Sequence, residues 1–179
     1  MSQIVVSPLV KLAETAVRFK AGSMISLLGP GHDVHRPAVI PAERHLLLGV
    51  NDVTVALEGL VAPAEAHVRA IIDFAKAWDR SAPMLIHCWM GISRSPAAAL
   101  IAALSLEPDQ DDHALVLRLR AASPFVTPNA RLVELGDHVL QRGGRLIAAV
   151  KAIGRGADAY EGVPFVLTIG AQKTEDARR

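Results

Sequence analysis

Residues 84–104 read MLIHCWMGISRSPAAALIAAL, and this stretch decides the expected fold. The apolar run Met84–His87 is typical of a short buried strand, and the Ala-rich run after Arg94 and Ser95 is typical of a helix. The only cysteine of the chain, Cys88, opens the loop between them. A loop that enters a helix N-terminus points backbone N–H groups at an anion. The sequence therefore predicts an anion-binding loop with a nucleophile at its mouth.

Each fixed residue of the spacing His87-Cys88-x-x-Gly91-x-x-Arg94-Ser95 has a physical task if the anion is a phosphate. Beside a guanidinium and a helix N-terminus, Cys88 is expected to ionise to a nucleophilic thiolate at neutral pH. Gly91 lets the chain curl with its amides inward, and Arg94 offers a planar fork for two phosphoryl oxygens. We expect Ser95 to donate its hydroxyl to the sulfur when the sulfur leaves. His87 is expected to orient the loop through hydrogen bonds.

The complete signature resembles H-C-x5-R-[S/T], the motif of the cysteine-dependent protein tyrosine phosphatase superfamily, and in particular of its compact dual-specificity-like branch. Two further segments are similar to that branch. Thr127-Pro128-Asn129 resembles its Pro-Asn helix start, and Asn51-Asp52-Val53 resembles its general-acid loop. The resemblance covers roughly residues 24–142 and implies the phosphatase fold for most of the chain.

The resemblance also implies a two-step phosphatase that needs no cofactor. Cys88 would attack phosphorus and Arg94 would hold its oxygens together with the loop amides, giving a cysteinyl-phosphate that water hydrolyses. Asp52 would protonate the leaving oxygen, because a departing tyrosinate has a conjugate acid with a pKa of about 10. Phosphotyrosine-type monoesters are the leading expected substrates. Phosphoserine, phosphothreonine, nucleotide and inositol phosphates are not excluded as substrates. The implied phosphate-binding residues are Trp89, Met90, Gly91, Ile92, Ser93 and Arg94.

The acid is the least typical part of the pattern. The segment Asn51-Asp52-Val53 lacks the Trp-Pro-Asp sequence of the larger tyrosine-specific enzymes. Asp52 could instead cap a turn, as Asn-Asp pairs do. Asp33 and Glu58 would then be the weaker candidates for the acid.

Two other functions stay open on the same residues. A phosphatase-like module could bind phosphorylated proteins with little turnover if the acid is misplaced. A reactive thiol could also act as a redox switch, although the chain has no second cysteine to resolve a sulfenic acid. The expected partner of the phosphatase is a phosphorylated protein or a small phosphomonoester.

Composition and periodicity predict one α/β domain over residues 1–179, with a mainly parallel central sheet flanked by helices in three layers. The 51% hydrophobic and 21% charged residues suffice for one buried core. Val163–Ile169 could be an added edge strand or an interface, and disorder is expected from about residue 171. The predicted strands are Ile4–Val6, Met24–Leu28, His45–Val50 and Met84–His87. The predicted helices are Pro8–Lys20, Pro63–Trp78, the run after Arg94, Asp111–Ala122 and Asn129–Ile153, the last with a possible break at Gly143-Gly144.

Charge and motif content argue against several other partners. A net charge of +1 gives no global reason for nucleic acid or a membrane surface. A spanning helix over Ala82–Leu106 would place Arg94 at the bilayer centre, so no membrane segment is expected. His32-Asp33-x-His35 has no second cluster with metal-like spacing, so no metal is predicted; it is expected to be a polar loop near the pocket.

The single cysteine and the lack of a leader pattern favour the cytoplasm. Trp89 is expected either to line the pocket or to pack. The oligomeric state and the role of residues 154–179 are not predicted.

Overall fold

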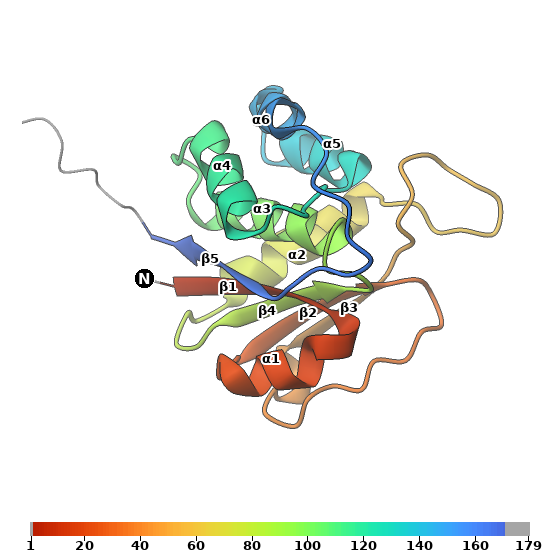
Figure 1. Ribbon diagram of the computed structural model, residues 1–179, viewed down its shortest axis with the longest axis vertical. Helices are drawn as coiled ribbons and strands as arrows, with labels where there is room; N and C mark the ends of the chain where they lie inside the picture. Colours follow the sequence, from red (N-terminus) through yellow and green to blue (C-terminus); the bar gives the residue numbers. More distant parts are fainter. Residues whose placement is uncertain (1, 171–179) are drawn as a thin grey trace, which may run out of the picture.

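The computed structural model describes residues 2–170 and centres on a five-stranded sheet in the order β3-β2-β4-β1-β5 (Figure 1). The first four strands run parallel, and β5 pairs antiparallel with β1. The predicted mainly parallel sheet is confirmed, and the apolar run near residue 165 is its edge strand. The expected disorder from about residue 171 lies outside the described residues. The strands are β1 (Ser2–Pro8), β2 (Ser23–Leu28), β3 (His45–Gly49), β4 (Met84–Cys88) and β5 (Phe165–Ile169).

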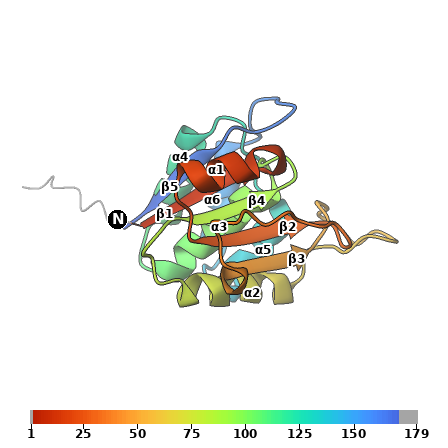
Figure 2. The ribbon, with the colours of Figure 1, turned by 90° about the horizontal axis from the view of Figure 1, so that it is seen from below.

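Helices cover both faces of the sheet and complete three layers (Figures 1 and 2). On one face a 3₁₀ turn (Leu9–Lys11) leads into α1 (Leu12–Arg18), and a second 3₁₀ turn (Ala42–Arg44) precedes β3. None of the helices within residues 2–170 is long and apolar enough to cross a membrane. The other face carries α2 (Glu65–Ala77), α3 (Arg94–Leu106), α4 (Asp112–Ala122), α5 (Ala130–Val139) and α6 (Arg145–Ile153).

The break expected in the last long helical pattern is present. Gly143 and Gly144 both have positive φ, at 64° and 87°, and lie between α5 and α6. Asp137 of α5 accepts hydrogen bonds from the backbone N–H groups of Gly144 and Leu146, at 2.7 and 3.0 Å. These bonds satisfy donors at the start of α6 that would otherwise lack partners. The two helices therefore meet at a fixed corner.

The sheet buries both faces because the strands β1, β2 and β4 are mainly apolar in their central residues. Val5, Met24 and Leu85 face the smaller cluster under α1, while their neighbours along each strand face the larger cluster under α2–α6. All residues of α3 from Arg94 to Leu104 are buried. The small alanines of this helix let the surrounding helices approach closely, which makes α3 the centre of the larger layer.

This topology brings the candidate site residues to one edge of the sheet. The carboxyl ends of parallel strands meet at the same edge, where binding sites of α/β sheets form. β4 ends at Cys88, β3 is followed by Asn51 and Asp52, and β1 ends at Pro8. Residues that are far apart in sequence therefore surround the loop after β4.

Candidate active site

The loop that follows β4, residues 88–94, has four carbonyl groups that accept hydrogen bonds from backbone N–H groups of distant residues. A trans peptide points its C=O and the following N–H in opposite directions, so each outward carbonyl turns the next N–H toward the loop centre. This arrangement is an anion nest. Trp89 O accepts from Leu9 N (3.0 Å), Met90 O from Gly162 N (2.9 Å), Ile92 O from Thr127 N (2.8 Å) and Ser93 O from Asn129 N (3.1 Å).

Gly91 is required at the top of this loop for two reasons. Its φ is 70°, in the left-handed region that side chains disfavour. A Cβ at this position would also lie 2.8 Å from Pro8 N and 3.0 Å from the Ser7 carbonyl carbon. The end of β1 therefore touches the loop backbone directly, and only glycine leaves room for that contact.

Cys88 lies at the bottom of the nest, at the carboxyl end of β4, and is 2% exposed. Its Sγ is 3.1 Å from Oγ of Ser95, which belongs to the first turn of α3. A hydroxyl at this distance can donate to a thiolate sulfur. The sulfur thus has a hydrogen-bond donor on the helix side and the ring of amides on the other.

Arg94, the first residue of α3, is only 7% exposed and has an incompletely satisfied guanidinium. Nη1 donates to the carbonyl of Val50 at 2.7 Å, directly after β3. Nε has no partner among residues 2–170. The Nε atoms of Arg118 and Arg120 are unpaired as well, so an unpaired donor alone does not identify a site. Arg94 is also the last residue of the anion nest, and this position makes its unpaired donor a place for a ligand oxygen.

Asp52 is joined to the same loop. Its Oδ1 accepts from Ser93 Oγ at 2.7 Å and from Asn129 Nδ2 at 2.8 Å. Both of these donors are side chains, and within the described residues Asp52 accepts no backbone N–H, so it does not cap a turn. The neighbouring Asn51 closes the loop, since its Oδ1 accepts from Val61 N at 2.8 Å. The carboxylate is exposed, so it can reach a bound group at the mouth of the loop. Among the described residues, Asp33 and Glu58 make no hydrogen bond to residues 88–95.

A chain of hydrogen bonds runs across three adjacent strands to the base of the loop. His87 Nε2 lies 2.6 Å from Ser26 Oγ, and Ser26 Oγ lies 2.8 Å from His45 Nε2. His87 Nδ1 lies 3.3 Å from the Cys88 carbonyl, which can only accept. A neutral His87 ring therefore carries its proton on Nδ1 and accepts the Ser26 hydroxyl at Nε2. The Cys88 carbonyl thus fixes the tautomer of His87, and the Ser26 hydroxyl supports it by donating to Nε2.

Burial keeps His87 neutral. Its side chain is 0% exposed, and desolvation lowers its pKa to about 4. The positive charges of His45 and Arg94 act in the same direction, against the hydrogen bond to the Cys88 carbonyl. The pKa of His45 is itself lowered, first by burial and then by Arg36. Near neutral pH His87 is therefore not charged and cannot act as the general acid. It serves the loop as a fixed hydrogen-bonding group.

Trp89 is 49% exposed, and its ring meets His32 edge-on at 5.4 Å between centroids. This contact places the loop after β2 against the signature loop. No group of three or more His, Cys, Asp or Glu side chains within residues 2–170 is arranged to hold a metal ion.

No protein-family model and no curated protein sequence matches this chain. Solved structures do resemble it. The dual-specificity phosphatase DUSP15 superposes with a TM-score of 0.60 at 16% identity, covering 83% of this chain and 88% of that one. Human DUSP28 gives 0.58 at 18% identity over 76% and 87%. The PTP-2 phosphatase of Cydia pomonella gives 0.57 at 20% identity over 74% and 83%.

The chain has the protein tyrosine phosphatase fold. The resemblance to the compact dual-specificity branch is thereby confirmed at the level of the fold. At identities of 16–20% the likeness extends no further than the architecture. What this phosphatase fold can do chemically has to be argued from its own residues.

Several residues that support the loop of this phosphatase fold were not identified from the sequence. Asn129 was expected to start a helix and does so, accepting from Leu132 N at 3.0 Å, but its amide also holds Asp52. Ser26 gave a signal, since it is a lone polar residue in the apolar run Met24–Leu28. Gly162 gave none, because a backbone N–H carries no sequence pattern.

Proposed function

We propose that the protein is a cysteine-dependent phosphatase that hydrolyses phosphomonoesters, with phosphotyrosine-type esters as the leading substrates. The observation that carries the proposal is the unpaired, buried Nε of Arg94 beside the amide ring above Cys88. A phosphoryl group would satisfy the guanidinium and the inward N–H groups together. Such preorganised donors stabilise the charge that develops on the phosphoryl oxygens without reorganising.

The reaction follows from these positions. The Cys88 thiolate attacks phosphorus, an S–P bond forms and the P–O bond to the leaving group breaks. Asp52 gives its proton to the leaving oxygen. Both Oδ1 contacts of Asp52 are donated by neighbours, which leaves Oδ2 to carry that proton.

In the second step Asp52 takes a proton from water, and the water oxygen attacks phosphorus. The S–P bond breaks, inorganic phosphate forms, and the Ser95 hydroxyl donates to the departing thiolate. The 3.1 Å separation between Ser95 Oγ and Cys88 Sγ supports this role.

The test uses the wild type and the variants Cys88→Ser and Asp52→Asn on p-nitrophenyl phosphate and on a phosphotyrosine peptide. We expect Cys88→Ser to lose at least about 10⁴-fold in kcat, because the nucleophile is gone. Asp52→Asn should lose about 100-fold on the peptide and less on p-nitrophenyl phosphate, whose better leaving group needs less protonation. Rapid quenching should trap phosphate on Cys88 of the wild type.

Asp33→Asn is the matched control, because Asp33 is exposed on the neighbouring loop after β2. It should keep wild-type rates on both substrates. An equal loss in Asp33→Asn and Asp52→Asn would reassign the acid. A wild type that binds vanadate but hydrolyses neither substrate would replace the enzyme with a phosphoprotein-binding module.

A further inference from the structure

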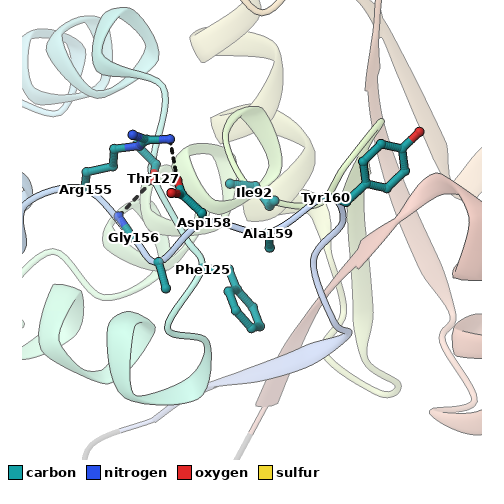
Figure 3. A pocket seen from close by; sticks show the side chains of 9 residues that line it. Ile92, Phe125, Thr127, Arg155, Gly156, Asp158, Ala159 and Tyr160 are labelled. Atoms are coloured by element: carbon teal, nitrogen blue, oxygen red, sulfur yellow. Dashed lines mark hydrogen bonds and ion pairs between the residues drawn. The ribbon is translucent and has the colours of Figure 1, made fainter.

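A cleft of about 530 Å³ lies beside the signature loop (Figure 3). One wall is formed by Phe125 and Thr127, which precede α5, and the other by residues 155–160, which lead from α6 toward β5. Ile92 of the signature loop contributes to the lining between them. The cleft is therefore formed jointly by the candidate active site and by the C-terminal segment to which the family resemblance does not extend.

Hydrogen bonds from backbone and side-chain groups join the two walls. Gly156 N donates to Thr127 Oγ1 at 3.0 Å, and Ala157 N donates to Pro124 O at 2.9 Å. Arg120 Nη2 donates to the carbonyls of Gly154 and Val126, at 2.8 and 3.0 Å. These bonds fix residues 154–157 against residues 124–127, so this end of the cleft is formed before a ligand binds and needs little ordering of the protein.

The cleft is continuous with the phosphate-binding loop. Ile92 lines it with its side chain, while the Ile92 carbonyl accepts from Thr127 N at 2.8 Å and so turns the following N–H toward the nest. The same segment reaches Asn129, whose amide holds Asp52. A chain whose phosphorylated residue occupies the nest thus has this cleft beside it.

The charges of the cleft favour an apolar occupant. Its two charged residues, Arg155 and Asp158, form an ion pair of 2.7 Å and lie largely exposed at the rim. The pair leaves no excess positive charge for a second phosphate group. Apolar groups of Ile92, Phe125 and Ala159 line the interior, and the Tyr160 ring points away from it (Figure 3).

We propose that this cleft binds an apolar side chain next to the phosphorylated residue of a polypeptide substrate. The proposal rests on the proposed phosphatase function and narrows it to protein substrates with an apolar residue at one flanking position. Binding energy from such a remote side chain would be gained in addition to the phosphate contacts.

The test compares phosphotyrosine peptides that differ only in one flanking residue, placed in turn at each of the three positions on either side. That residue is Leu, Gly, Asp or phosphoserine. At one position we expect kcat/KM for Leu to exceed that for Gly by about fivefold to tenfold, as for the partial burial of one aliphatic side chain. The Cys88→Ser protein should show the same ratio in Kd, which makes the readout independent of turnover.

Ala159→Trp fills the cleft and should bring the Leu-to-Gly ratio close to one. Val163→Trp is the matched control, because Val163 is exposed on the same segment outside the cleft. It should keep both the ratio and the rate on p-nitrophenyl phosphate. Phe125→Ser removes part of the apolar lining without adding bulk, and should lower the ratio if Ala159→Trp does not fold.

The outcomes separate the two proposals. A wild type that hydrolyses p-nitrophenyl phosphate without any flanking preference overturns the cleft proposal and leaves the phosphatase intact. A preference for Asp or phosphoserine over Leu, or a Leu preference that survives both cleft variants, overturns it as well. Loss of p-nitrophenyl phosphate hydrolysis with the Kd ratio retained overturns the phosphatase and supports the cleft.

Discussion

Two loops surround the candidate site, and they are held in opposite ways. The signature loop, residues 88–94, is bonded through its backbone to the end of β1, to the segment before α5 and to Gly162. The acid loop, residues 52–61, is closed at its base by two bonds of 2.8 Å between Asn51 and Val61, and Ser93 and Asn129 hold only its first residues. Figure 1 shows it projecting from the body after β3. Its exposed apolar side chains include Val55, Leu57 and Leu60.

The difference matches what each loop has to do. Donors that stabilise developing charge are effective when they are fixed before the reaction, because no energy is then spent on turning them. An acid needs only its carboxylate to be placed, and Asp52 is placed by Ser93 and Asn129. The signature loop is therefore fixed through its backbone, whereas in the acid loop the side chain of Asp52 is fixed.

The largest effect expected from this comparison comes from a pair of glycines with similar positive φ. Gly91 has φ 70° and Gly59 of the acid loop has φ 76°, but a Cβ on Gly59 meets nothing within 4 Å. Gly91→Ala should lower kcat/KM on p-nitrophenyl phosphate at least about 100-fold, as for the loss of one oxyanion donor. It should also lower the free energy of unfolding by about 1–3 kcal/mol.

Gly59→Ala should change kcat/KM by no more than about twofold, since it lies on an open surface. Urea unfolding and steady-state kinetics on both variants provide the comparison. Equal losses in the two would mean that backbone strain alone, without the contact to β1, sets the effect.

The second expected effect is a pH dependence of the free energy of unfolding. It should arise from buried His87, below the signature loop, and not from an exposed histidine. The pKa of His87 is lowered to about 4 in the folded protein, against 6.5 in an unfolded chain. The unfolded state therefore binds an extra proton between these values. The free energy of unfolding should fall as the pH drops from about 6.5 toward 4, by up to about 3 kcal/mol from this group.

The measurement is urea unfolding at pH 7 and pH 4.5 for the wild type, His87→Gln and His113→Gln. His113 is exposed on α4 and serves as the matched control. The pH dependence should weaken in His87→Gln and persist in His113→Gln. Identical slopes in all three proteins would show that folding does not lower the pKa of His87.

The smallest effect tests one of the two side chains that hold Asp52. Asn129→Ser keeps a good N-cap for α5 but loses the amide that donates to Asp52. We expect about a tenfold loss of kcat on the phosphotyrosine peptide, a smaller loss on p-nitrophenyl phosphate and little change in stability. Asn129→Ala should add a stability loss of about 1 kcal/mol, because the cap is also removed. A loss of equal size on both substrates would show that Asn129 acts on the loop amides instead of on the acid.

The sequence was informative where the determinants are local. The strand, loop and helix around Cys88 could be predicted because apolar periodicity, glycine and the helix start lie within one short stretch. Asp52 could be placed near them because it follows another parallel strand. Both inferences need only the order of elements and the rule that strand ends share an edge.

The remaining contacts could not be predicted because they join distant residues through groups that every residue has. The Gly162 N–H that holds Met90 O leaves no trace in the sequence, and Val163–Ile169 is too short an apolar run to distinguish an edge strand from an interface. The role of Ser26 depends on three strands lying side by side. Such features follow from the topology, which has to be known first.

The position of Gly162 has a consequence for how the protein is made. A ribosome that has finished Asn129 has already synthesised every residue that we assign to the chemistry, from Asp52 to Ser95. The Met90 carbonyl still lacks its partner, and β1 still lacks its neighbour β5, until the segment through residue 169 has left the exit tunnel. Non-local contacts of this kind form late. Activity on a nascent chain should therefore switch on well after its last catalytic residue has emerged.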